Sequence, residues 1–329
     1  MTPVLKQVSA FAGIGGFDVG FGRAGIATAC QIEWDAHCQT ILRRHFAGTT
    51  LHGDISDTRG DQVGRVDLAT GGFPCQDTSI AAPHRSGLAG RRSGHFFEFA
   101  RLVEEYARLV DALNPRWVVI ENPTGLLKSN GGRDAATVFD HLEQLGYGWA
   151  YRVVDARHLG SPQRRGRVLV VGHRGGDPRP AGQVLGLHEH GGEADRAREV
   201  GGPSLGPRPA GGSHRDFTVW RKSARARAAL SKGGYETWVA DGMANTLTGF
   251  DGGGPARQTH LIAQGGRVRA LTLTEWERLQ GFPDGWTDGI PDSARYTAIG
   301  NAMHVGMAEW LGRRLVAVHQ QIPMLGAVA

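Results

Sequence analysis

The chain has 329 residues, of which 40% are hydrophobic and 21% charged; this composition is ordinary for a folded globular protein and excludes disorder throughout. Such a length allows one large hydrophobic core and a smaller second unit. The formal net charge is +5 and most basic residues are arginine, which favours a nucleic-acid partner, although a GC-rich genome would enrich arginine equally.

The N-terminus and the cysteines indicate neither export nor a metal. The first residues lack the apolar region of a signal peptide, and no apolar run is long enough to cross a bilayer. The three cysteines, Cys30, Cys38 and Cys75, form no CxxC pair and have no spacing to histidine that is typical of zinc. We therefore expect a cytoplasmic protein with no membrane contact, no disulfide framework and no structural metal.

A glycine-rich turn follows the first predicted strand, Val8–Phe11. Such a turn between a strand and a helix lets a nucleotide approach the backbone, because glycine has no side chain. No GK[ST] sequence follows it, which excludes a phosphate-binding P-loop and a triphosphate ligand. The residues of this candidate cofactor loop are Phe11, Gly13, Ile14, Gly15 and Gly16.

Acidic residues end the next two predicted strands. Glu33 follows the strand Ala27–Ile32 at the offset where an acid meets ribose hydroxyls in dinucleotide folds. Trp34 either stacks on adenine or packs in the core. A third unit ends near the same edge with Asp54 and Ile55. A ligand with ribose and adenine but no triphosphate fits this pattern, and S-adenosylmethionine is such a ligand.

The run Val66–Thr70 predicts a buried strand that delivers the loop Gly71–Ser79 at its carboxyl end, where open α/β sheets place their chemistry. A lone cysteine is commonly a small buried core residue. Here paired glycines, Pro74 and polar neighbours indicate a loop built to present the Cys75 thiol.

An apolar helix over Gly94–Glu104 precedes the fully apolar strand Trp117–Ile120, which runs into Glu121 and Asn122. A carboxylate at the end of a buried strand costs free energy unless it has a partner, so burial alone makes Glu121 a site candidate. The alternative is a carboxylate that caps a helix.

Three polar side chains precede the apolar run Val168–Gly172. If this segment is extended, Gln163, Arg165 and Arg167 project to one side and present donors for anions or carbonyl groups. A solvated basic loop is the alternative.

Glycine, proline, histidine and arginine dominate from about residue 175 to residue 266, which predicts a second, smaller, loop-rich domain. Within it the segment Arg221–Leu230 is compatible with a helix. Order returns in Leu271–Gln280, where Thr272 or Thr274 begins a capping box and Gly281 ends the helix. The fold class is α/β, a doubly wound, mostly parallel Rossmann-like sheet with this smaller domain.

These motifs together resemble the DNA (cytosine-5) methyltransferase family, over most of the chain and in the family's order. Two positions depart from the family pattern: Pro123 stands where valine is usual, and His95 where leucine is common. The similar elements are Phe11–Gly16, Pro74–Gln76, Glu121–Asn122, Gln163–Arg165, Glu275–Pro283 and Gly300–Asn301.

The resemblance implies a domain order and a set of site residues. Residues 1–174 would bind S-adenosylmethionine and form the catalytic domain. Residues 175–292 would recognise the target sequence in the substrate, and residues 293–329 would return to the catalytic domain. The implied catalytic residues are Cys75, Glu121, Arg165, Arg167, Pro74 and Asn122. The implied cofactor-binding residues are Phe11, Gly13, Ile14, Gly15, Gly16, Glu33, Trp34, Asp54, Ile55, Asn301 and Ala302. The implied substrate-binding residues are Gln76, Ser79, Gln163, Thr246 and Leu247.

The implied roles follow the chemistry of cytosine. The Cys75 thiolate would add to C6, Glu121 would meet the N3 edge with a carboxyl that burial keeps protonated, and Arg167 would hold O2. Arg165 would support the loop and Asn122 would brace the site. Neither C5 nor C6 is reachable in a stacked duplex, so the target base would be flipped out.

We expect double-stranded DNA as the partner of a monomeric enzyme in the cytoplasm of a bacterial or phage-infected cell, alongside a cognate restriction endonuclease or a later base-modifying enzyme. The alternatives are an RNA (tRNA) cytosine-5 methyltransferase and a catalytically dead DNA-binding relative. Thymidylate-synthase-like chemistry would not use the glycine loop. A nucleotide-binding dehydrogenase would leave the loops at Cys75 and Glu121 without a purpose.

Overall fold

The computed structural model describes residues 5–73, 89–187, 217–222, 238–240, 242–248, 260–264 and 266–322, with side chains from residue 101 onward in the long helix that begins at Ala89. The chain divides into two compact units. The large unit comprises residues 1–154, 167–195 and 307–329, and the small unit comprises residues 155–166 and 196–306. Each unit is described by itself.

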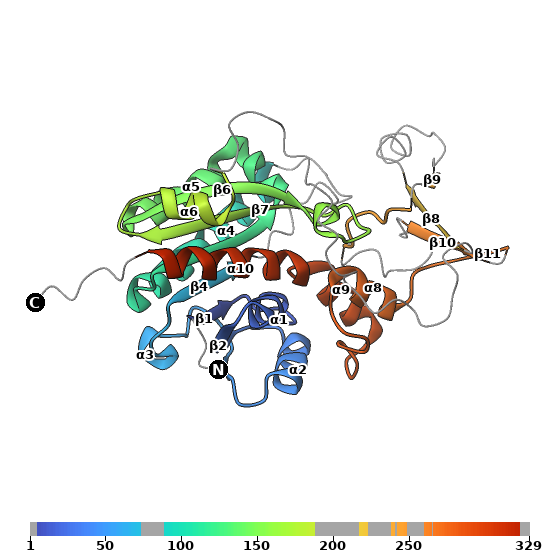
Figure 1. Ribbon diagram of the computed structural model, residues 1–329, viewed down its shortest axis with the longest axis horizontal. Helices are drawn as coiled ribbons and strands as arrows, with labels where there is room; N and C mark the ends of the chain where they lie inside the picture. Colours follow the sequence, from blue (N-terminus) through green and yellow to red (C-terminus); the bar gives the residue numbers. More distant parts are fainter. Residues whose placement is uncertain are drawn as a thin grey trace, which may run out of the picture. The chain divides into compact units, whose positions relative to one another are not determined.

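A seven-stranded sheet in the order β3-β2-β1-β4-β5-β7-β6 forms the centre of the large unit (Figure 1). The pairs β1–β2, β2–β3, β1–β4 and β4–β5 are parallel, and β7 runs antiparallel to β5. This confirms the predicted mostly parallel α/β class. The strands are β1 (Leu5–Ala10), β2 (Ile26–Ile32), β3 (Thr50–His52), β4 (Leu68–Gly72), β5 (Trp117–Pro123), β6 (Tyr147–Asp155) and β7 (Gly166–Arg174).

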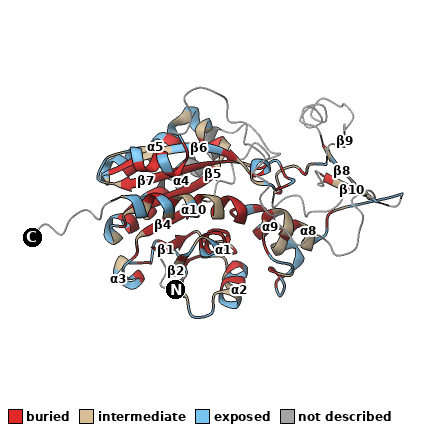
Figure 2. Cartoon of the chain, viewed as in Figure 1, coloured by how far each residue is buried: buried red, intermediate tan, exposed pale blue. Residues whose placement is uncertain are grey.

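Helices cover both faces of the sheet, because alternate residues of a strand point to opposite sides. Val118 and Ile120 of β5 belong to a buried apolar cluster with residues of α4 and α5. Trp117, on the other face, donates from Nε1 to His319 Nδ1 of α10 at 3.2 Å. The central strands β4 and β5 are therefore mostly buried, as Figure 2 shows for the greater part of the sheet.

Two helices of the large unit show how the sequence sets a helix end. Asp35 accepts a hydrogen bond from Cys38 N at the start of α2, and Asn114, with φ of 50°, ends α4 before Pro115. The helices are α1 (Gly16–Arg23), α2 (Ala36–His45), α3 (Gly60–Val63), α4 (Ala89–Leu113), α5 (Arg133–Gln144), α6 (Arg179–Val184) and α10 (Val305–Gln321), whose first two residues belong to the small unit.

The described residues of the small unit form an antiparallel sheet in the order β11-β10-β8-β9, the α-helices α8 and α9, and a 3-10 helix at Ala156–Leu159. The predicted helix from Arg221 is wrong at its start, because Arg221 and Lys222 pair within β8 with His260 and Trp238; residues 223–230 lie outside the described residues. These elements are β8 (Phe217–Lys222), β9 (Trp238–Ala240), β10 (His260–Gln264), β11 (Arg267–Arg269), α8 (Leu273–Gln280) and α9 (Asp292–Asn301).

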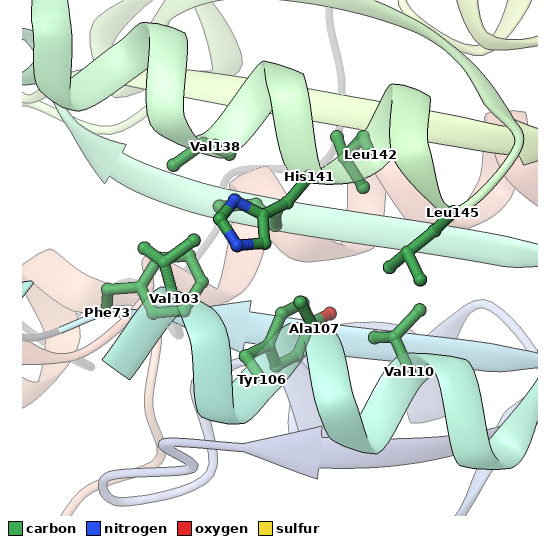
Figure 3. Close-up of a pocket in the computed structure, with 10 residues that line it drawn as sticks. Phe73, Val103, Tyr106, Ala107, Val110, Val138, His141, Leu142 and Leu145 are labelled. Carbon is green, nitrogen blue, oxygen red and sulfur yellow. The ribbon is translucent and has the colours of Figure 1, made fainter. Parts of the chain in front are cut away.

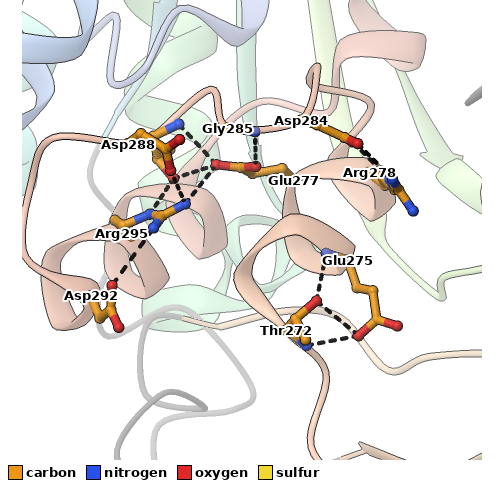
Figure 4. Close-up of polar contacts among 10 residues, drawn as sticks. Thr272, Glu275, Glu277, Arg278, Asp284, Gly285, Asp288, Asp292 and Arg295 are labelled. Carbon is orange, nitrogen blue, oxygen red and sulfur yellow. Dashed lines mark hydrogen bonds and ion pairs between the residues drawn. The ribbon is translucent and has the colours of Figure 1, made fainter.

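The capping box that the sequence predicts begins α8. Thr272 accepts a hydrogen bond from Glu275 N, and the Glu275 side chain accepts one from Thr272 N at 2.7 Å. Within α8 the wholly buried Glu277 carboxylate accepts hydrogen bonds from Gly285 N and Thr287 N, which follow the helix, each at 2.8 Å; Figure 4 shows the contact with Gly285. Glu277 thereby fixes the turn between α8 and α9.

Candidate active site

The predicted cofactor loop follows β1 and ends where α1 begins, at Gly16. Three of its residues have positive φ: Phe11 (53°), Gly13 (56°) and Gly15 (86°). A Cβ on Gly15 would lie 2.6 Å from the Phe46 ring, so only glycine fits there. A Cβ on Gly13 would meet no atom within 4 Å, so the backbone faces open space at that position.

Glu33, at the end of β2, holds this loop. Its Oε2 accepts a hydrogen bond from Gly13 N at 2.7 Å, and its Oε1 accepts one from Asp35 N at 2.8 Å. Burial raises the pKa of this carboxyl, and the hydrogen bonds from backbone N–H groups oppose that rise. The neighbouring Trp34 is 71% exposed, which excludes the alternative that it packs in the core.

The third predicted cofactor segment follows β3. Asp54 is exposed, and hydrogen bonding from Ser56 N is the main cause that lowers its pKa. Ile55 is buried beside it. Asp54 and Ile55 thus follow β3 in the parallel part of the sheet, as the cofactor loop follows β1 and Glu33 follows β2.

The strand that leads to the predicted nucleophile is β4, and the described residues stop at Phe73. Pro74, Cys75, Gln76 and Ser79 lie outside the described residues. In the sheet register Gly72 of β4 pairs with Glu121 of β5, and a Cβ on Gly72 would lie 3.5 Å from Glu121 Oε2. The start of the nucleophile loop therefore lies beside the Glu121 carboxyl.

Glu121 and Arg167 form a buried ion pair. Arg167 Nε lies 2.6 Å from Glu121 Oε1, and the two residues are 8% and 7% exposed. Their strands bring them together, because Pro123 pairs with Arg167 in the antiparallel register of β5 and β7. Glu121 is thus a strand residue with a partner and does not cap a helix.

Asn122 follows Glu121 in β5 and is also buried. Neither its amide nitrogen nor its amide oxygen has a hydrogen-bond partner among the described residues. A buried amide without partners costs free energy, which makes Asn122 a candidate for contact with a bound molecule.

In the small unit, Gln163 and Arg165 are wholly buried, which excludes the solvated basic loop. Gln163 donates from Nε2 to Leu279 O at 2.8 Å. Arg165 donates to Leu247 O at 3.3 Å, to Gly300 O at 3.2 Å and to Ala302 O at 2.6 Å. The expectation that these donors serve carbonyl groups is confirmed for both residues.

Arg165 therefore brings together several predicted residues of the small unit. Ala302 and Leu247 accept from it, and Thr246 donates from its hydroxyl to Arg164 O. Asn301 is exposed next to Ala302. Direct substrate contact by Gln163, Thr246 and Leu247, and cofactor contact by Asn301 and Ala302, stay predictions.

The sequence profile of the family described as C-5 cytosine-specific DNA methylase matches residues 5–190 and 218–317. The chain belongs to this family. It is a DNA (cytosine-5) methyltransferase with S-adenosylmethionine as its methyl donor.

Known relatives are similar to this methyltransferase over nearly its whole length. The type II methyltransferase M2.BsuMI of Bacillus subtilis (strain 168) is 30% identical over 94% of this chain and 75% of its own. M.NlaX of Neisseria lactamica is 29% identical over 95% of this chain and 97% of its own. Both alignments span the large and the small unit.

Solved structures with low sequence identity share the fold. A DNMT2 mutant of Spodoptera frugiperda superposes with a TM-score of 0.63 at 15% identity, covering 94% of this chain and 99% of that one. A DNA modification methyltransferase encoded within an E. coli prophage superposes with a TM-score of 0.62 at 17% identity, covering 96% of this chain and 99% of that one. These likenesses support the methyltransferase fold.

The residues at the edge of the methyltransferase sheet fit S-adenosylmethionine. The open backbone at Gly13 leaves room for a ligand, and the exposed Trp34 indole offers a flat surface for adenine. The Glu33 carboxylate accepts from Gly13 N and Asp35 N, and because a carboxylate offers about four acceptor sites, it keeps capacity for a ribose hydroxyl. These residues would hold the methyl donor.

The sequence analysis missed Asp18, a buried residue of α1 that ties the helix after the cofactor loop to β1 and β2. Its Oδ2 accepts a hydrogen bond from Ser9 Oγ of β1 at 3.1 Å, and its Oδ1 accepts one from Gln31 Nε2 of β2 at 3.0 Å. Burial raises its pKa. The sequence did contain a signal for this residue, because an aspartate among the apolar residues at the start of α1 indicates a buried polar group with partners.

The described residues offer neither a membrane-spanning helix nor a cluster of metal ligands. No described helix is both long and apolar enough to span a membrane. No group of three or more His, Cys, Asp or Glu side chains in the same parts of the chain is arranged to hold a metal ion.

Proposed function

We propose that this methyltransferase acts on cytosine in double-stranded DNA through a covalent bond between Cys75 and C6. Cytosine C5 is too weak a nucleophile to take a methyl group unaided, and addition of a thiolate at C6 turns the ring into an enamine whose C5 carries the electron density. S-adenosylmethionine supplies the methyl group as a sulfonium. Loss of the C5 proton then expels the Cys75 thiolate and restores the ring.

The observation that carries this proposal is the buried pair of Glu121 and Arg167 beside Gly72, on the strand that runs toward Cys75. Glu121 would meet the N3 edge of the base, and Arg167 would hold both the O2 atom and the Glu121 carboxyl. Asn122, Pro74 and Arg165 would fix the surrounding backbone. Such preorganised groups stabilise charge that develops in the transition state.

The target base would be flipped out of the helix, at a cost of a few kcal/mol that contacts in the pocket offset. We propose that residues 1–174 form the cofactor-binding and catalytic domain and residues 293–329 its C-terminal segment. Residues 175–292 would then read the DNA, with arginines on phosphates and other side chains on base edges. Gln76, Ser79, Gln163, Thr246 and Leu247 would serve substrate binding.

The biological role we propose is DNA modification by a monomer in the bacterial cytoplasm, as a type II methyltransferase paired with a restriction endonuclease. The bacterial relatives are named type II methyltransferases, which supports this role. A later base-modifying enzyme is the other partner that would use the product.

The experiment is transfer of labelled methyl groups to duplex DNA and to tRNA by the wild type and by Cys75→Ala. We expect label in DNA at C5 of cytosine for the wild type and none for the variant. Label in tRNA alone would instead favour the RNA methyltransferase, and undiminished transfer by Cys75→Ala would overturn the covalent mechanism.

A further inference from the structure

One turn of α4, Glu105–Arg108, contacts loops that follow three different strands of the large unit. Its large buried side chain is Tyr106, which is 3% exposed. The Tyr106 ring lies 5.3 Å from the Phe73 ring at an interplanar angle of 89°, and 6.5 Å from the Phe11 ring. Phe11 and Phe73 are themselves 5.3 Å apart. The three rings form one aromatic cluster.

This cluster joins the two loops on which the reaction depends. Phe11 begins the cofactor loop and is held at a φ of 53°, and Phe73 directly precedes Pro74 and Cys75. A non-glycine residue with positive φ is strained, and it persists only where its surroundings hold it. The Tyr106 ring supplies part of that support.

Tyr106 also fixes the end of β4. A Cβ on Gly71 would lie 3.0 Å from the Tyr106 ring, so the ring packs directly against the strand backbone. The ring lines an apolar crevice between α4 and α5, with Phe73 at one end and His141 projecting from α5 (Figure 3). The Tyr106 hydroxyl has no hydrogen-bond partner among the described residues. The ring, rather than the hydroxyl, makes the contacts.

Arg108, on the same turn, holds the third loop. Its NH2 group donates to Ile55 O at 2.9 Å and to Thr58 O at 3.0 Å. Glu105 fixes the guanidinium from the other side, accepting from Arg108 Nε at 3.0 Å. Asp54, predicted to bind the cofactor, lies in the loop that these contacts close.

We propose that Tyr106 and Arg108 are positioning residues for methyl transfer, with separable effects. Tyr106 positions the cofactor loop and the start of the nucleophile loop together, whereas Arg108 positions the Asp54–Thr58 loop alone. The inference rests on the proposed function of these loops. Loss of the Tyr106 ring should therefore weaken S-adenosylmethionine binding and slow the chemical step, while loss of Arg108 should weaken binding only.

The experiment compares four variants by their kcat and their KM for S-adenosylmethionine on duplex DNA. For Tyr106→Leu we expect a rise in KM and a fall in kcat, each of about tenfold or more. For Arg108→Met we expect a rise in KM of about fivefold with kcat within about twofold of the wild type. Tyr106→Phe, which keeps the ring, should match the wild type. Val110→Ala enlarges the same crevice from the next turn of α4, and its kcat and KM should also match those of the wild type.

Folded enzyme is counted by the stoichiometry of S-adenosylhomocysteine binding in calorimetry, so that misfolded protein does not lower kcat. If Tyr106→Leu does not fold, Tyr106→Met must show the same double change. Three results would overturn the proposal. Tyr106→Phe could be as impaired as Tyr106→Leu, or Tyr106→Leu could have the kcat and KM of Val110→Ala. Arg108→Met could also lower kcat as much as Tyr106→Leu does. Failure of the Cys75 mechanism would appear separately, in the wild type with Cys75→Ala.

Discussion

Arg167 Nε lies 2.6 Å from Glu121 Oε1, and both side chains are almost wholly buried at the ends of neighbouring strands. Desolvating two charges is costly, and close pairing offsets that cost only while both partners are present. The pair is thus expected to orient the Glu121 carboxyl, which lies beside Gly72 on the strand that leads to Cys75.

Replacing Arg167 by methionine should remove this partner and leave the Glu121 carboxylate buried alone. We expect a loss of about 3 to 5 kcal/mol in the free energy of unfolding and at least about a hundredfold fall in kcat. Urea denaturation and single-turnover methylation measure the two effects. Arg313→Met is the control, because the Arg313–Glu309 pair at 2.7 Å lies on an exposed helix surface and should cost about 1 kcal/mol or less. Equal effects of the two variants would contradict the role given to Arg167.

Arg165→Lys should destabilise the small unit even though the charge is kept. A lysine ammonium cannot reproduce the planar fork by which Arg165 reaches the carbonyl groups of Leu247, Gly300 and Ala302. We expect a loss of about 2 to 3 kcal/mol in urea denaturation. The matched change Arg157→Lys affects a half-exposed ion pair with Asp155 and should be nearly neutral. An unchanged free energy of unfolding in Arg165→Lys would contradict the stabilising role given to the Arg165 hydrogen bonds.

The stability of the protein should fall between pH 6.5 and pH 4 because of His260. Burial lowers the pKa of His260 from 6.5 to about 4, so the unfolded chain binds a proton in this range and the folded chain does not. Above pH 6.5 His260 is neutral in both states and does not lower the free energy of unfolding. As the pH falls from 6.5 toward 4, protonation of the unfolded chain lowers that free energy by about 3 kcal/mol in all. Urea denaturation across this range should show a shallower pH dependence for His260→Gln. An unchanged slope would show that other groups carry the effect.

Cys75 should be the cysteine that reacts with iodoacetamide in the native enzyme at neutral pH. Burial raises the pKa of Cys30 to about 11, helped by the nearby Asp18 charge, and burial also raises the pKa of Cys38 far above its ordinary value. Peptide mapping by mass spectrometry after a short exposure should find the label on Cys75. Denatured protein, in which all three cysteines are exposed, is the control. Rapid native labelling of Cys30 or Cys38 would contradict their burial.

The sequence predicted those features that depend on neighbours along the chain. The glycine loop and the capping box of α8 are each visible in a short stretch of consecutive residues, and Glu33 directly follows the apolar end of β2. The central strand β5 was recognisable because both faces of a parallel sheet are buried, which makes the run Trp117–Ile120 continuously apolar.

Long-range partners could not be predicted in this way. Gln163 and Arg165 were recognised as donors for anions or carbonyl groups, but which partners they reach depends on how distant segments pack. Tyr106 was missed because a tyrosine on the apolar stripe of a helix looks like any core residue. Arg108 was missed because an arginine in a helix is more often solvated.

The most direct test of the covalent mechanism uses duplex DNA with 5-fluorocytosine at the target position, together with S-adenosylmethionine. Fluorine cannot leave C5 as a proton does, so the enzyme should stay bonded to the base. We expect a denaturation-resistant complex whose DNA is attached at Cys75, and none with Cys75→Ala. A wild-type enzyme that methylates ordinary DNA but forms no such complex would contradict attack by Cys75 on C6.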